Sequence, residues 1–151
     1  MKQTIILRSL SDITCTREIS KNAGKMSKLI ADVIEDIIED GPQTIDIQVT
    51  NAHTLADIVT YMEHHWDNKP IPIPKPLTAR FESAVSQWDY EFFVDVMSNQ
   101  DPTHRYARLI ALANAANFLN IPELMEFTCA AIASIIHASN GIDVVALFNG
   151  N

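Results

Sequence analysis

Glycine is scarce in this sequence, with four residues in a chain of 151. Nucleotide-binding loops use closely spaced glycines, which let the backbone approach a phosphate group. The patterns GxxxxGK(S/T), GxGxxG, GxSxG and HExxH are all missing. The sequence therefore argues against nucleotide chemistry, and no motif supports an enzyme.

Cysteine and basic residues are also few. Cys15 and Cys129 are the two cysteines, and neither belongs to a CxxC pattern, which leaves no basis for a disulfide framework or a zinc site. Eleven basic side chains against nineteen acidic ones give a formal net charge of −8. This charge opposes the phosphate neutralisation on which nucleic-acid binding depends. We expect a protein of the cytoplasm or nucleus with no nucleic-acid partner.

Long hydrophobic runs are missing as well. The longest low-charge tracts, LIALANAANFLNI and FTCAAIASII, fall short of the ~18 apolar residues that a membrane-spanning helix needs. The short apolar run near the N-terminus is broken by Arg8 and has no cleavage site behind it. We therefore expect a soluble protein with no membrane partner.

Candidate metal ligands and catalytic side chains do not form a recognisable group. His64 and His65 are adjacent, and adjacent helical residues point about 100° apart, which is unsuited to holding one metal ion. The acidic residues at 35, 36, 39 and 40 lack the spacing of a calcium-binding loop and indicate a solvated helix face. We expect no metal, no cofactor and no catalytic residue.

The first 67 residues predict a small α/β unit. Alternating apolar residues around positions 5–7 and 13–15 indicate a hairpin that turns at 9–12, and TIDIQV predicts a third strand. Between them, apolar residues from Met26 to Ile38 recur at helical spacing as far as Gly41 and Pro42. Thr54 with Asp57 resembles the N-cap of a following helix.

Prolines at 70, 72, 74 and 76 predict an extended spacer over residues 68–77. A plain connector fits this segment better than a ligand for a proline-binding module, which generally also shows flanking arginines. Beyond the spacer the pattern is helical, with helices over WDYEFFVDV, 104–119 and 122–137. Asn120 is a candidate cap for the last of these, and Asn140 for a short final turn that ends at Phe148.

From Leu109 onward the sequence contains no lysine or arginine, and only three acidic residues. A surface helix of a monomer normally carries a wide charged face. These helices either form the buried centre of the domain or leave an apolar surface for a partner. We favour a partner surface for helix 122–137, because little chain follows to cover it.

Four blocks of sequence resemble a known family. MEHHWDNKP, WDYEFF, LANAANFLNIPELMEFTCAAIASII and the ending at LFN occur in the order, and mostly at the spacing, of the S-phase-kinase-associated (Skp) adaptors of cullin–F-box ubiquitin ligases. The resemblance covers most of the chain and is dense from Ile58 onward. Two departures are the longer connection MSNQDPTHR before Leu109 and the missing final helix after FNGN.

The resemblance implies an α+β fold of the BTB/POZ type, a small three-stranded sheet with helices plus a helical C-terminal extension. Residues 1–67 would form the α/β unit and 68–77 the spacer. Residues 78–151 would complete the core and form the extension. Trp88, Phe92 and Phe93 would fasten the extension to the α/β unit.

The resemblance also implies which residues bind partners. The F-box-facing positions correspond to Ile110, Met125, Cys129, Ile132, Ile136 and Phe148, and the cullin-facing positions to Asn117 and Phe118. The implied function is a non-catalytic adaptor that bridges a cullin scaffold to F-box substrate receptors. The alternative is a diverged Skp-like structural subunit, which would use the same apolar surface to form a homodimer or to join a non-ligase complex.

Overall fold

The computed structural model describes residues 4–10, 14–37, 43–48, 52–73, 80–98 and 106–138. The chain divides into two compact units. The first unit comprises Met1–Lys69 and Asn114–Pro122, and the second comprises Pro70–Ala113 and Glu123–Asn151. Helices and a small sheet together confirm the expected α+β class.

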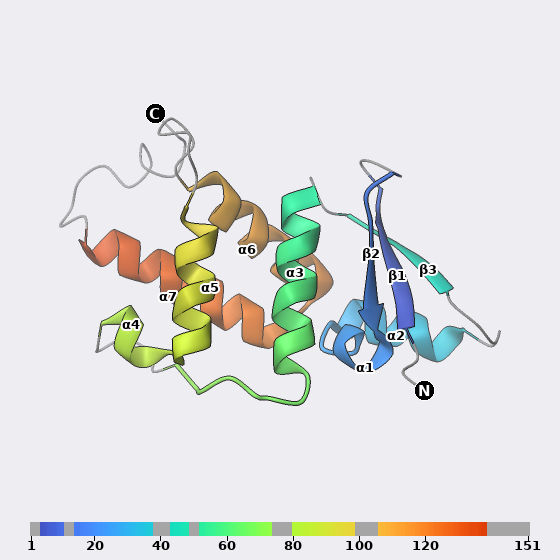
Figure 1. The fold of residues 1–151 in the computed structure, drawn as a ribbon, viewed down its shortest axis with the longest axis horizontal. Coiled ribbons are helices and arrows are strands. Elements are labelled where there is room, and N and C mark those ends of the chain that lie inside the picture. The colour runs from blue at the N-terminus through green and yellow to red at the C-terminus, as the bar shows by residue number, and fades with distance from the viewer. Residues whose placement is uncertain are drawn as a thin grey trace. The chain divides into compact units, whose positions relative to one another are not determined.

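A three-stranded sheet in the order β2-β1-β3 is the framework of the first unit (Figure 1). The central strand β1 (Thr4–Ser9) buries Ile5 and Leu7, as their alternation with polar residues predicts. It pairs antiparallel with β2 (Thr16–Ser20) and parallel with β3 (Gln43–Ile47). The predicted hairpin and third strand are confirmed.

The second strand of the hairpin lies later in the chain than predicted. Cys15 precedes β2, and its carbonyl oxygen accepts a hydrogen bond from the Ser9 amide at 3.0 Å. Ile13 and the second half of the predicted turn lie outside the described residues. The alternation at 13–15 therefore indicated a strand in this region but not the register, which the pairing of Thr4 with Ser20 defines.

The helix predicted from Met26 onward is present, and a short helix that was not predicted precedes it. In α1 (Lys21–Gly24) the Ser20 side chain accepts from the Ala23 amide, and in α2 (Lys28–Asp36) the Ser27 side chain accepts from the Ile30 amide. Each serine starts a new helix because its side-chain oxygen satisfies an amide that has no partner within the helix. An extended backbone at Ile37 ends α2, and the predicted end at Gly41 and Pro42 lies outside the described residues.

Gly24 allows α1 to lie close to the sheet. A Cβ atom at this position would lie 3.0 Å from Ile5 Cδ1 and 3.3 Å from Ile30 Cγ2. Both neighbours are fully buried core side chains with little freedom to move. An added side chain at position 24 would therefore require these neighbours to shift by a few tenths of an ångström.

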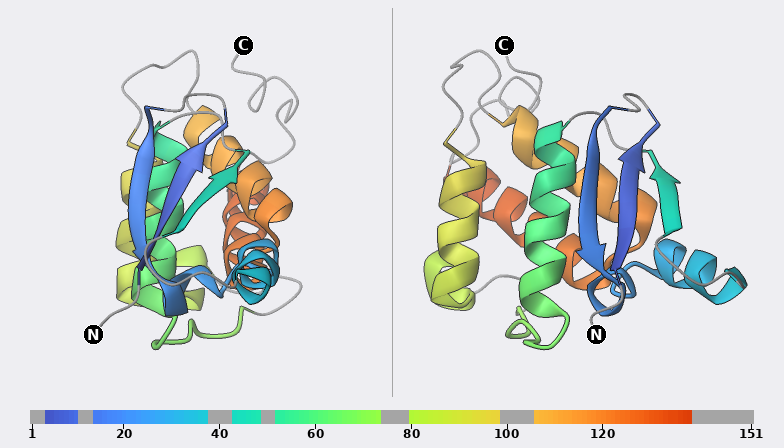
Figure 2. Two further views of the ribbon diagram at one scale, coloured as in Figure 1. Left: turned by 90° about the vertical axis from the view of Figure 1, so that its right-hand side faces the viewer. Right: turned by 45° about the vertical axis from the view of Figure 1, so that its right-hand side comes forward.

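Helix α3 (Ala52–His65) packs against β2 and α1 (Figure 2, green). The predicted helix is confirmed, and its Leu55, Ile58 and Met62 side chains are buried. The predicted cap is wrong, because the helix begins at Ala52 and both Thr54 and Asp57 lie inside it and are buried.

A short polar cluster joins α3 to the end of β2. The Glu63 carboxylate accepts hydrogen bonds from the Ser20 amide at 3.0 Å and from the Ser20 hydroxyl at 2.6 Å. Ser20 thus caps α1 and also binds α3.

The second unit is built from helices. The elements are α4 (Phe81–Ala84), α5 (Gln87–Val96), the first part of α6 (Ala107–Leu119) and α7 (Pro122–Ala138). Sequence periodicity predicted all of them except α4, whose four residues are too few to show a helical period. Residues 70–73 of the spacer form no helix or strand, whereas the proposed turn at 140–148 lies outside the described residues.

Aromatic rings form the core of the second unit. Phe81 lies 4.8 Å from Phe93 and 5.6 Å from Phe127, measured between ring centroids. Phe92 lies 5.7 Å from Phe127 and stacks on Trp88 at 5.4 Å. The QWDYEFF stretch therefore anchors α5 to α4 and α7, while its proposed attachment to the α/β unit stays a prediction.

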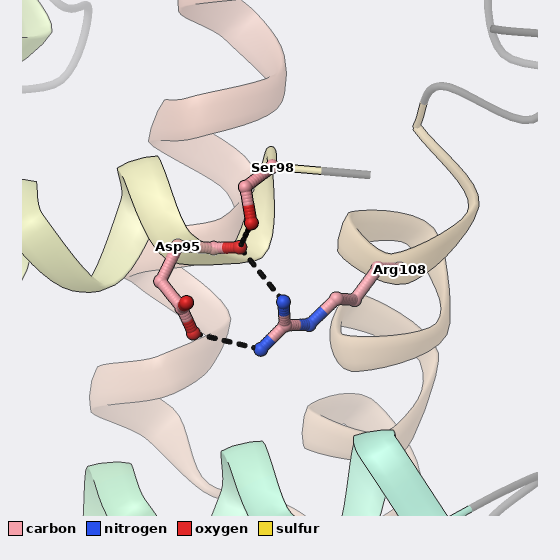
Figure 3. A network of polar contacts seen from close by, with 3 residues as sticks. All are labelled: Asp95, Ser98 and Arg108. Atoms are coloured by element: carbon pink, nitrogen blue, oxygen red, sulfur yellow. Dashed lines mark hydrogen bonds and ion pairs between the residues drawn. The ribbon is translucent and has the colours of Figure 1, made fainter. Parts of the chain in front are cut away.

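Arg108 joins the start of α6 to the end of α5 (Figure 3). Its guanidinium donates to the Asp95 carbonyl oxygen at 2.7 Å and to the Asp95 carboxylate at 2.9 Å. The Ser98 hydroxyl donates to the same carbonyl at 2.6 Å. This network binds together the two described ends of the segment that connects α5 to α6.

Candidate partner-binding surfaces

The polar side chains of the described ranges do not form a metal site. No group of three or more histidine, cysteine, aspartate or glutamate side chains could hold an ion there. His65 is buried, and its Nδ1 atom lies 2.6 Å from the Asn68 carbonyl oxygen. Because a carbonyl only accepts, Nδ1 carries the proton and His65 closes the end of α3. Among the described helices, none is both long and apolar enough to cross a membrane.

Four of the predicted partner-binding residues lie along one face of α7. Met125, Cys129, Ile132 and Ile136 follow one another at intervals of four, three and four residues, which places them in a single row. We call this row the α7 stripe. Cys129 and Ile136 are exposed, the latter by 40%, and Met125 and Ile132 are half-buried. No member of the stripe carries a charge.

The other side of α7 explains why the stripe is left open. Leu124, Phe127, Thr128 and Ala131 are all at most 2% exposed. The Thr128 hydroxyl donates to the Leu124 carbonyl at 2.9 Å, so this buried polar group costs little free energy. Burial of this face fixes the rotation of α7 about its axis and turns the stripe outward.

Ile110 and Phe148 complete the predicted F-box-facing set. Ile110 lies on α6, is half-buried and belongs to the same unit as the α7 stripe. Phe148 lies outside the described residues. The structure thus collects four of the six residues on one helix face and places a fifth in the same unit.

The predicted cullin-facing residues lie together near the end of α6, in the first unit. Asn117 and Phe118 are both exposed, Phe118 by 48%. The flanking Ala116 and Leu119 are fully buried. We call Asn117 and Phe118 the α6 end. Exposing this much of a phenyl ring to water is unfavourable, and a bound partner could bury the ring.

Asn120 closes α6 instead of capping α7, which corrects the sequence-based prediction. Its φ angle is 53°, a left-handed conformation that asparagine adopts more readily than most residues. The Asn120 amide donates to the Asn117 carbonyl at 3.3 Å, and the Ile121 amide to the Ala116 carbonyl at 3.0 Å. These bonds reverse the chain directly after the α6 end.

The α6 end has a neighbour that sequence reasoning missed. The buried Ser27 hydroxyl, at the start of α2, donates to the Leu119 carbonyl at 2.5 Å. The next amide, that of Lys28, donates to the Asn120 carbonyl at 2.9 Å. A serine before an apolar stripe could have located the start of α2, but no local signal predicts a bond to a residue so far along the chain.

Comparisons with known proteins identify relatives of this chain. A family model described as the Skp1 family, tetramerisation domain, matches residues 14–67. The S-phase kinase-associated protein 1 homolog of Tetrahymena thermophila is 30% identical over 136 residues, which cover 87% of this chain and 74% of that protein.

Two further relatives are more distant. The E3 ubiquitin ligase complex SCF subunit sconC of Aspergillus clavatus is 24% identical over 149 residues, 99% of this chain and 86% of that protein. SKP1-like protein 11 of Arabidopsis thaliana is 26% identical over 133 residues, 87% of this chain and 75% of that protein.

Proposed function

Because the chain belongs to the Skp1 family, we propose that it is a non-catalytic adaptor that bridges a cullin scaffold to F-box substrate receptors in a ubiquitin ligase. The names of its relatives support this role, since sconC is an SCF ubiquitin ligase subunit by name. The BTB/POZ-type fold that the family implies agrees with the small three-stranded sheet and its helices.

The α7 stripe is the observation that carries the proposal. It is apolar, uncharged and partly open to water, while the opposite face of α7 is buried. An amphipathic helix of an F-box protein could lay its apolar face along such a row, with anchors at helical spacing. Specific interfaces bury roughly 800 Å² on each partner, and a few central apolar anchors dominate their binding energy.

The α6 end is the proposed cullin-binding surface. Phe118 supplies an exposed aromatic ring and Asn117 an amide that can donate and accept hydrogen bonds. This combination suits a contact with an apolar centre and a polar rim. The free thiols of Cys15 and Cys129 fit the proposed location in the cytoplasm or nucleus, where thiols remain reduced.

The test replaces Ile132 and Ile136 with aspartate together. We expect this variant to lose co-purification with F-box proteins, because a carboxylate buried at an interface is costly. It should remain folded, because Ile136 is exposed and Ile132 is half-buried, so neither side chain is fully enclosed in the core. Val94→Asp is the matched control, since Val94 is an exposed apolar residue of the same unit that lies outside the stripe. Circular dichroism monitors folding in both variants.

Two results would contradict the proposal. One is undiminished capture of F-box proteins by the Ile132→Asp, Ile136→Asp variant. The other is a concentration-independent homodimer in light scattering, with no F-box protein co-purifying from the native cell, which is the result expected of a self-associating structural subunit.

A further inference from the structure

The start of α2 and the end of α6 satisfy each other's free backbone groups. A helix leaves its first amides and its last carbonyls without partners inside the helix. Here the Leu119 carbonyl accepts from the Ser27 hydroxyl, and the Asn120 carbonyl accepts from the Lys28 amide. Both partners belong to the first unit. The positive end of the α2 dipole also meets the negative end of α6, which is favourable.

Ser27 makes two bonds at once. Its oxygen accepts from the Ile30 amide at 3.1 Å as the N-cap of α2, and its hydroxyl proton goes to the Leu119 carbonyl. The side chain is completely buried, so a lost bond could not be replaced by water without opening the structure. Leu119 follows directly on the α6 end, so the bond constrains the turn that carries Asn117 and Phe118.

We infer that Ser27 is a positioning residue for cullin binding, which it controls by holding the last turn of α6 and so the orientation of Asn117 and Phe118. The inference rests on the proposed function. Ser27 cannot touch a partner because it has no exposed surface. Its influence is exerted through the fraction of molecules whose α6 end has the binding-competent conformation.

The experiment measures binding of the full chain to a purified cullin and, separately, to an F-box protein. In Ser27→Ala we expect cullin affinity to fall about three- to tenfold, a factor that corresponds to one net hydrogen bond. F-box affinity should not change. Ser27→Thr keeps a hydroxyl that can both accept and donate, and it should restore cullin binding.

Ser86→Ala is the matched control. Ser86 also caps a helix through its side chain, which accepts from the Asp89 amide at 3.2 Å at the start of α5 in the second unit. Both substitutions remove the side-chain cap of a helix amide, and only Ser27→Ala also removes a bond to the Leu119 carbonyl. We expect Ser86→Ala to bind a cullin as the wild type does, which separates positioning from general destabilisation.

Hydrogen exchange gives a readout that needs no partner. We expect the amides of Lys28 and Ile121 to exchange faster in Ser27→Ala than in Ser86→Ala. Unchanged exchange, or cullin affinity no weaker in Ser27→Ala than in Ser86→Ala, would overturn the inference while leaving the proposed function intact. Failure of the wild type to bind any cullin would instead overturn the proposed function.

Discussion

At the level of single residues, Arg8 and Asp46 show how a surface pair ties two strands together. They are direct partners in the parallel register of β1 and β3. Arg8 Nε donates to Asp46 Oδ1 at 2.6 Å, and Nη2 donates to Oδ2 at 3.1 Å. The hydrogen bond and the attraction of the guanidinium lower the pKa of the Asp46 carboxyl.

This shift predicts a dependence of stability on pH. A lowered carboxyl pKa stabilises the fold above the unfolded-state value, here 3.8, and the contribution disappears as the pH falls through the folded-state pKa. We therefore expect Asp46→Asn to be less stable than the wild type near neutral pH, with a gap that closes in acid. Urea unfolding at a series of pH values below neutrality measures this gap.

The size of the gap should be small, because both side chains are substantially exposed. Asp32→Asn is a suitable control, since Asp32 faces Lys28 at 3.8 Å and both of those side chains are more exposed. A stability gap between Asp46→Asn and the wild type that stays constant across the acid range would show that the pairing does not cause it.

At the level of elements, Arg108 fixes the junction of two helices. The Asp95 carbonyl that it binds lies in the last turn of α5, where the helix dipole is negative and a cation is favourable. The Arg108 side chain is only 20% exposed, whereas that of Asp95 is 68% exposed. The bond to the carbonyl should therefore contribute more than the bond to the carboxylate.

This difference predicts that substitution of Arg108 destabilises the fold more than substitution of Asp95. Arg108→Met keeps most of the stem but removes both hydrogen bonds, and should lower the free energy of unfolding by roughly 1–2 kcal/mol. Asp95→Asn leaves the carbonyl in place and should cost clearly less. Chemical denaturation measures the free energy of unfolding of both variants. Equal decreases in the two variants would show that the bond to the carboxylate, and not the bond to the carbonyl, is the stabilising one.

Sequence periodicity predicted most elements of this fold but not their ends. The apolar residues from Met26 to Ile38 form an unbroken helical pattern, yet α2 ends at Asp36 and exposes Leu29. Similarly, Thr54 has the chemistry of a cap but lies within α3. A local pattern identifies residues that can share a face, whereas packing against the sheet and neighbouring helices decides where a helix stops.

At the level of the whole molecule, the two proposed surfaces lie on different helices and in different units. The α6 end belongs to the first unit, and the α7 stripe belongs to the second. Substitutions at sites with no shared partners usually have independent effects. We therefore expect a substitution at one surface to leave binding at the other unchanged.

Phe118→Asp tests this independence. We expect it to lose cullin binding by at least tenfold, since a charge replaces an apolar anchor of the kind worth roughly 2 kcal/mol or more. Its F-box affinity should equal that of the wild type, as measured by calorimetry. Leu10→Asp is the control, because Leu10 is an exposed apolar residue of the same unit. Loss of both partners in Phe118→Asp would show that the surfaces are coupled.

The candidate surfaces were predictable only in part. The spacing of the α7 stripe predicts that its four residues share one face of the helix. The family resemblance identifies that face as the one that binds F-box proteins. The sequence cannot show that the opposite face is buried, because both faces of this helix are apolar. Ser27 was missed for a related reason, since its partner at Leu119 is adjacent only in three dimensions.

The order of the strands has a consequence for how the chain reaches its native state. The hairpin of β1 and β2 closes over a short loop, whereas β1 and β3 pair across the longer segment that carries α1 and α2. The longer closure costs more chain entropy. During synthesis, one edge of the central strand therefore has no partner until β3 has been made, and an unpaired strand edge can pair with another copy of the chain.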